Sequence, residues 1–373
     1  TPVAVVPFGW EGRGPAMPLN VATVITADLR RSGRFAPIAE DKMLQKPTDG
    51  VDVDFQDWSF VGVEAVVVGK LTQTDNDRFT LQFQLFDVFG QRQLVGFRMP
   101  NVTRATMRGA AHRAADMIYE KLTGERGAFA TRIAYVVASG TSRALKVADS
   151  DGHNDKTILS SNQPILSPAW SPDGKRLAYV SFESGRPAIY VQELTSGNRS
   201  KLTGFPGLNG APAWSPDGSR LALTLSKDGS PDVYIMDIGS RQLRRLTFDD
   251  AIDTEPTWSP DGQWIAFTSD RGGKPQVYRV PVSGGTPQRL TFEGSYNADA
   301  SWSPDGKSIA LISRSGGDQV AILDLASRGL QTISTGSLNE SPSYAPNGSM
   351  VVYAAGGGVL SVVAVDYDVQ QRL

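Results

Sequence analysis

The stretch Pro168-Ala-Trp-Ser-Pro-Asp-Gly174 recurs along the chain and decides its fold. The later copies are Pro212-Ala-Trp-Ser-Pro-Asp-Gly218, Glu255-Pro-Thr-Trp-Ser-Pro-Asp-Gly262, Asp299-Ala-Ser-Trp-Ser-Pro-Asp-Gly306 and a degraded Pro342-Ser-Tyr-Ala-Pro-Asn-Gly348. The aromatic residues of successive copies stand 44, 44, 44 and 42 residues apart. A fixed period of this size is typical of solenoids, propellers and arrays.

Each copy contains the chemistry of a tight turn between two strands. Ser-Pro-Asp-Gly suits a type I turn, in which proline presets φ and the glycine takes a left-handed backbone. An apolar strand follows each turn, at residues 176–181, 220–224, 264–268 and 308–312. Two further short strands complete each repeat, and four antiparallel strands per repeat make one blade of a β-propeller.

The repeats predict six blades, over residues 131–165, 166–209, 210–253, 254–297, 298–339 and 340–373. The first blade lacks a sequence for its inner strand. Because an open sheet edge invites fraying, we expect the ring to close with a strand from the other terminus. No further Trp-Ser-Pro copy follows the last blade, so we expect the chain to be truncated; a three-stranded first blade is the alternative.

The first third of the chain carries no repeat and reads as a small α/β domain. A helix is expected over residues 20–31, with Asn20 as its N-cap and Gly33 at its end. An apolar strand at 64–71 and an alternating strand at 78–86 precede a second helix at 103–122. The predicted fold is thus a six-bladed all-β propeller (131–373) preceded by a smaller α/β domain (1–125).

Composition narrows the possible functions. A net charge of −2 over 373 residues provides no electrostatic basis for binding nucleic acid or anionic lipid. No apolar run is long enough to span a membrane. Without cysteine, disulfides, thiolate metal ligands and thiol catalysis are impossible. We expect no cofactor.

A search for catalytic groups supports no enzyme. The two histidines are expected on a helix surface (His112) and at a hairpin tip (His153), and no Gly-x-Ser-x-Gly elbow occurs. The acidic stretch at residues 149–155 superficially resembles a calcium-binding loop. Its glycine is at the wrong position for such a loop and the distal glutamate is missing, so the stretch is interpreted as a turn. Two alternatives remain open, a propeller that gates substrate for a serine peptidase and a small-ligand sensor.

The remaining candidate is a surface, which we call the mouth. It comprises the loops that enter the inner strands, at residues 208–211, 253–255, 297–299 and 339–341. It also comprises the loops that join the second strand of a blade to the third, at residues 183–186, 227–228, 270–271 and 314. These loops carry short polar groups of mixed sign. Such a surface suits the docking of a protein loop or an extended peptide.

Several stretches, together with the repeats, resemble the TolB family of the Tol-Pal cell-envelope system: Val5-Val-Pro-Phe8, Ala65-Val-Val-Val-Gly69, Glu120-Lys-Leu-Thr-Gly124 and Gly127-Ala-Phe-Ala130. The resemblance implies a non-enzymatic periplasmic scaffold, associated with membranes only through its partners. Its propeller would bind the lipoprotein Pal at the mouth and link it to TolA, maintaining outer-membrane integrity and constriction at division. Colicins would use the same mouth.

The resemblance also implies which residues face Pal. Matched one by one, these are Leu208, Asn209, Gly210, Ala211, Thr254 and Glu255; the repeat extends the set to Asp299 and Glu340. Two features of the family are not matched in this sequence. The N-terminal extension that contacts TolA and the C-terminal Trp-Ser-Pro strand both fall outside it.

Overall fold

The structure is a computed structural model that describes residues 1–367 and 369–373. Its residues group into two compact units. The N-terminal unit consists of Thr1–Thr131, Asp149–Asp151 and Asp366–Gln371. The propeller unit consists of Arg132–Ala148, Gly152–Val365 and Arg372–Leu373. No helix in the described residues is both long and apolar enough to cross a membrane.

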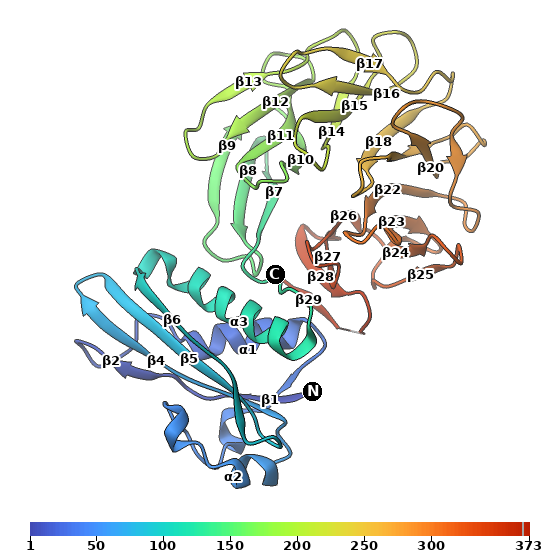
Figure 1. The fold of residues 1–373 in the computed structure, drawn as a ribbon. Helices are drawn as coiled ribbons and strands as arrows, with labels where there is room; N and C mark the ends of the chain where they lie inside the picture. The colour runs from blue at the N-terminus through green and yellow to red at the C-terminus, as the bar shows by residue number, and fades with distance from the viewer. Residues whose placement is uncertain (368) are drawn as a thin grey trace. The chain divides into compact units, whose positions relative to one another are not determined.

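The N-terminal unit is built on a mixed sheet of order β3-β1-β4-β5-β6, with β2 also pairing β4 (Figure 1). The pairs of β1 with β3 and β4 are parallel, whereas β4, β5 and β6 run antiparallel. The strands are β1 Pro2–Val5, β2 Gly9–Glu11, β3 Ala36–Pro37, β4 Ala65–Asp75, β5 Arg78–Asp87 and β6 Arg92–Val102.

Helices cover both faces of this sheet. The expected helices are present as α1 (Val21–Arg31) and α3 (Met107–Thr123), which lie side by side (Figure 1). Asn20 caps α1 by accepting a hydrogen bond from the backbone N–H of Thr23. On the other face, Trp58 of α2 (Phe55–Phe60) is fully buried against alternate valines of β4. Short 3₁₀ turns lie at Glu40–Lys42, Gly50–Asp52 and Arg104–Thr106.

The propeller unit confirms the predicted six blades of antiparallel strands (Figure 1). Within the described residues the first blade has three strands and the other five have four. From the first blade to the last, the strands are β7 Arg132–Ser139, β8 Ser142–Asp149, β9 Lys156–Ser161; β10 Ile165–Trp170, β11 Arg176–Ser181, β12 Ala188–Glu193, β13 Arg199–Lys201; β14 Asn209–Trp214, β15 Arg220–Leu225, β16 Asp232–Asp237, β17 Leu243–Arg245; β18 Asp253–Trp258, β19 Trp264–Ser269, β20 Gln276–Pro281, β21 Gln288–Arg289; β22 Asn297–Trp302, β23 Ser308–Arg314, β24 Asp318–Asp324, β25 Leu330–Thr332; and β26 Glu340–Tyr344, β27 Met350–Ala355, β28 Val359–Ala364, β29 Gln370–Arg372.

The repeated tryptophans join neighbouring blades. Trp214 packs in the apolar layer between the second and third blades, and its indole Nε1 donates to the Ala169 carbonyl at 3.1 Å. Trp258 repeats this bond one blade later, to Ala213 at 3.1 Å. Among the described residues, the buried indole Nε1 atoms of Trp170 and Trp302 have no hydrogen-bond partner.

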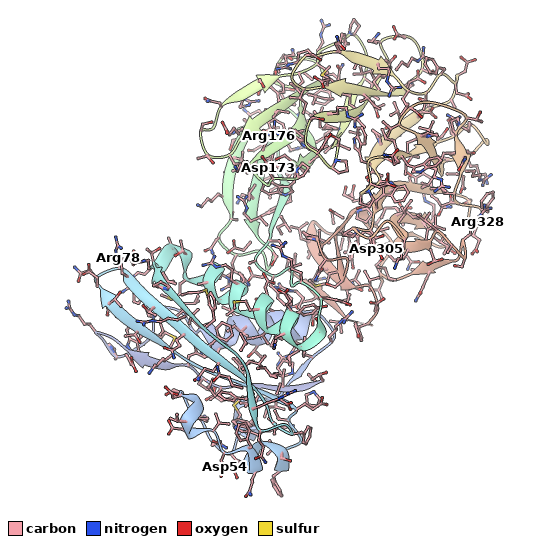
Figure 2. The ribbon with its side chains drawn as sticks, viewed as in Figure 1. Asp54, Arg78, Asp173, Arg176, Asp305 and Arg328 are labelled. Carbon is pink, nitrogen blue, oxygen red and sulfur yellow. The ribbon has the colours of Figure 1, made fainter. Side chains whose placement is uncertain are left out.

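The Ser-Pro-Asp-Gly turns close as the sequence predicts. In the turn at Ser215, the Asp217 carboxylate accepts hydrogen bonds from the Ser215 hydroxyl and the Ser219 backbone N–H. These bonds lower the pKa of Asp217 to about 2. Gly218 takes a left-handed backbone with φ 70°. Asp173 and Asp305 occupy the same position in other blades (Figure 2), and their carboxylates bond their own turns in the same way.

Candidate protein-docking surface

Each inner strand of the four-stranded blades carries a bulge just before its aromatic residue. The register shifts there, so that two residues lie opposite one on the neighbouring strand. The first residue of each bulge has a left-handed backbone: Ser167 (φ 50°), Ala211 (46°), Glu255 (54°), Asp299 (55°) and Ser341 (55°). This backbone is strained for residues other than glycine, and such strain concentrates at functional sites. The five bulges therefore mark the mouth as a candidate site.

The predicted partner-facing residues lie on or beside these bulges. Ala211, Glu255 and Asp299 are bulge residues, whereas Gly210, Thr254 and Glu340 each precede one, and Leu208 and Asn209 stand at the start of β14. Successive inner strands lie side by side, so the bulges form one row. The structure thus brings residues from four blades to one edge.

Asn209 differs from the other predicted residues because its side chain is buried. Its amide group donates to the carbonyls of Phe205 and Gly207 and accepts from the Phe205 backbone N–H. These bonds hold the loop that presents Leu208, whose side chain is 40 % exposed. Asn209 thus shapes the mouth, and Leu208 is the apolar group available on it.

The acidic bulge residues are connected across blades by hydrogen bonds. The Glu255 carboxylate accepts from the Thr268 hydroxyl at 2.7 Å and from the Asp299 backbone N–H at 3.0 Å. The Asp299 carboxylate in turn accepts from the Ser341 backbone N–H at 2.9 Å. Each acid thus satisfies a strained amide of the next blade. This chain of bonds fixes the shape of the mouth over the fourth, fifth and sixth blades.

The two acids share one electrostatic environment. Removal from water, together with the negative charges of Glu255 and Glu340, raises the pKa of Asp299 to about 7. Burial raises the pKa of Tyr296, and the negative charges of Glu255, Asp318 and Asp299 raise it further. The mouth therefore carries a carboxyl group that titrates near neutral pH.

The repeat shortens by two residues before the last blade, and this changes which residue matches Glu255. Ser341, not Glu340, has the left-handed backbone and stands at the position of Glu255 and Asp299. Glu340 matches Thr254 and is exposed. Counting back from the repeated aromatic residue gives the same alignment, since Glu255, Asp299 and Ser341 each stand three residues before it.

Ion pairs border the mouth and account for much of its mixed charge. Arg271 contacts Asp253 at 2.6 Å and Asp249 at 3.8 Å. Arg314 contacts Asp318 at 2.7 Å. The other Asp253 oxygen, Oδ1, is buried without a hydrogen-bond partner in this structure. Aligning the repeats would have found this position, since asparagine stands there in three of the other blades.

A second polar cluster lies in the N-terminal unit and is centred on His112. The prediction that His112 lies on a helix surface is wrong, because its side chain is buried. His112 is 1 % exposed, and its Nδ1 lies 2.6 Å from the Asp28 carboxylate. Its Nε2 lies 3.4 Å from Asp151, which also binds Arg108. Burial opposes the charged imidazolium, but Asp151 and Asp28 outweigh it and raise the pKa of His112 to about 9.

Within the described residues, one group has the spacing of metal ligands. Ligand atoms of His112, Asp149 and Asp151 lie within 4.8 Å of one another. However, the Asp151 Oδ2 already accepts two hydrogen bonds from Arg108, at 2.9 and 2.5 Å, so a guanidinium supplies the positive charge there. The group is built as an ion-pair network.

Comparison with known proteins identifies both units. The family model described as "TolB amino-terminal domain" matches residues 1–94, and that described as "TolB beta propeller domain" matches residues 119–373. The Tol-Pal system protein TolB of Methylococcus capsulatus is 62 % identical over all of this chain and 88 % of the relative. That of Thioalkalivibrio sulfidiphilus is 60 % identical, over all of this chain and 87 % of the relative.

A solved structure agrees over both units. The crystal structure of TolB from Acinetobacter baumannii superimposes with a TM-score of 0.91 at 43 % identity, covering all of this chain and 93 % of that one. The curated relatives are named as components of the Tol-Pal system and not as enzymes. The chain therefore belongs to the TolB family and is a cell-envelope component of the Tol-Pal type.

Proposed function

We propose that this chain is a non-enzymatic periplasmic scaffold whose mouth binds the lipoprotein Pal. The observation that carries the proposal is the row of strained bulges at Ala211, Glu255 and Asp299, held by hydrogen bonds between blades. A rigid, preformed edge of this kind loses little conformational entropy on binding. Leu208 supplies an exposed apolar contact beside this edge. The charged residues around it, such as the Arg271–Asp253 ion pair, favour the correct orientation of the partner.

The same proposal assigns the chain a linking role. Binding of Pal at the mouth would connect the outer membrane to TolA, whose contact is expected in an N-terminal extension and not in the residues described here. This link would maintain envelope integrity and support constriction at division. Colicins would enter by competing for the mouth residues.

Capture from a cell-envelope extract tests the proposal. Immobilised protein should retain a peptidoglycan-bound lipoprotein as its main partner, and Glu255→Lys should retain much less of it. Glu193→Lys is the matched control, since Glu193 is exposed and pairs in register with Arg176 at the opposite end of its blade. Equal capture by both variants, or capture of no lipoprotein, would reject the mouth as the Pal site.

A further inference from the structure

A basic cavity lies between the outer strands of the fourth and fifth blades, away from the mouth. Its volume is about 370 Å³. Arg279 of β20, Arg289 of β21 and Arg328 of the turn after β24 supply its charge. Leucines 290, 323 and 325 supply apolar wall. Figure 2 places Arg328 at the outer edge of the blades.

The three guanidinium groups face no carboxylate within ion-pair distance among the described residues. Arg279 Nε donates to the Gln288 side-chain oxygen at 3.1 Å, and Arg289 Nε donates to the Thr291 carbonyl at 2.6 Å. Both acceptors are neutral. Arg289 and Arg328 also lie over the same Phe292 ring, 5.2 and 5.6 Å from its centroid. The positive charges are therefore gathered but not neutralised.

One acid lines the cavity, and its own turn engages it. The Asp324 Oδ1 accepts hydrogen bonds from the backbone N–H groups of Ala326 and Ser327 and from the Ser327 hydroxyl. These hydrogen bonds lower the pKa of Asp324, and the two from Ser327 have the largest effect. Three arginines and one aspartate leave the lining with a formal charge of +2 (3 − 1).

The preceding blade shows that this charge is not a by-product of the repeat. Arg245, 44 residues before Arg289, pairs with the buried carboxylate of Asp232 at 2.6 Å. The residue 44 positions after Asp232 is Gln276, which cannot neutralise Arg289. Likewise, Arg279 occupies the position held by Ile235 one blade earlier. Compared with the preceding blade, the fourth blade thus keeps the arginine at the position of Arg245, gains Arg279 and loses the acid at the position of Asp232.

Arg328 has an internal counterpart that serves as a control. Residues 237–241 and 324–328 form the same turn, in which Arg241 (φ 61°) and Arg328 (φ 62°) share a left-handed backbone. In each turn the serine hydroxyl donates a hydrogen bond to the carboxylate of the aspartate that begins the turn. Arg241, however, donates to the Lys201 carbonyl at 3.4 Å, whereas Arg328 extends over Phe292 beside the cavity.

We propose that this cavity binds the phosphate group of an anionic ligand. Guanidinium groups match phosphate oxygens through paired N–H donors, and three of them offer more donors than one carboxylate can accept. The leucine wall lowers the local dielectric constant and strengthens each contact. The phosphate could belong to a lipid headgroup or to a small soluble phosphate, and the two sources are separated by experiment.

Calorimetric titration of the full chain with inorganic phosphate, at constant ionic strength, tests the site. Wild type and Arg241→Gln should bind saturably with equal affinity, whereas the double variant Arg279→Gln/Arg328→Gln should lose at least about tenfold. An unchanged melting temperature of the double variant establishes that it is folded. Absence of saturable binding, or an affinity that the double variant retains, would overturn the proposal.

Vesicle co-sedimentation separates the two sources. Binding to phosphatidic acid vesicles, but not to phosphatidylcholine vesicles, assigns the site to a lipid phosphate if the double variant loses it and Arg241→Gln keeps it. Phosphate binding without vesicle binding assigns it to a soluble phosphate. Vesicle binding that all variants share would reject the cavity as a lipid site.

Discussion

The backbone amide of Asp299 donates a hydrogen bond to the Glu255 carboxylate, 3.0 Å away on the preceding blade. Both residues have the left-handed backbone of the inner-strand bulge. The Asp299 carboxylate repeats the contact on the next blade, at Ser341. A carboxylate at the same strained position thus connects successive blades, and this arrangement places Glu255 and Asp299 close together at the mouth.

Proton binding by Asp299 should make stability fall as pH rises. Its pKa is raised to about 7 in the folded protein, above the value of about 4 in unfolded chains, so the folded state holds more protons between these values. The contribution of Asp299 to stability should therefore decline from about pH 4 to pH 7 and stay level above. Asp299→Asn, which keeps an acceptor for Ser341, should flatten this slope and add about 2 kcal/mol at pH 8.

Urea unfolding across this pH range measures the effect. Glu193→Gln should keep the wild-type slope, because it removes an exposed carboxylate remote from the Glu255–Asp299 pair. A slope that survives in Asp299→Asn would show that other groups set the pH dependence.

Much of this architecture can be predicted from the sequence, because period and turn chemistry are local. The Trp-Ser-Pro-Asp-Gly copies position the inner strands and their turns, and the cap at Asn20 marks the start of α1. The bulges cannot be predicted in this way, since Ala211 and Glu255 are not residues that favour a left-handed backbone. Their conformation follows from packing between blades.

The buried histidine escapes prediction for a different reason. His112 meets Asp28, 84 residues earlier, and Asp151, 39 residues later, and no local pattern joins these positions. The division into domains at residues 1–125 and 131–373 stays a prediction. The basic cavity could have been suspected, because aligning repeats at 44 residues sets Gln276 against Asp232.

The charged His112 should stabilise the N-terminal unit below neutral pH. Its pKa is raised from about 6.5 to about 9, so its contribution is fully present below pH 6.5 and is lost as pH rises through 9. His112→Gln should cost about 3 kcal/mol at pH 7, because it leaves Asp28 and Asp151 without a buried cation between them.

Hydrogen exchange of the α1 amides reports this loss without interference from the propeller unit. His153→Gln, which changes an exposed turn residue, should leave the α1 protection unchanged. If the wild-type protection does not fall between pH 6.5 and 9 more than that of His112→Gln, the imidazolium is not the stabilising species.

The strained bulges should reject branched side chains. Ser167 is exposed and has φ 50°, so Ser167→Val should cost about 2 kcal/mol through backbone strain alone. The neighbouring Leu166→Val is a matched control, since Leu166 is exposed and paired in regular register, and it should change stability by less than about 0.5 kcal/mol. Equal effects in urea unfolding would contradict the assigned backbone.

The inter-blade indole bonds should be measurable by comparing two tryptophans. Trp258 donates to Ala213, whereas the buried Nε1 of Trp302 has no partner in this structure. Trp258→Phe should therefore cost about 1 kcal/mol more than Trp302→Phe, since only the former breaks a hydrogen bond. Chemical unfolding of the two variants checks this order, and the reverse order would rule out the bond as a source of stability.

Calorimetric titration with the soluble domain of Pal tests the central claim most directly, that the bulge edge at Glu255 and Asp299 grips a partner protein. We predict that wild type and Glu193→Lys bind with the same affinity, and that Glu255→Lys weakens binding at least about tenfold while it remains folded and unfolds in a cooperative thermal transition. Equal affinity in all three proteins would contradict the account.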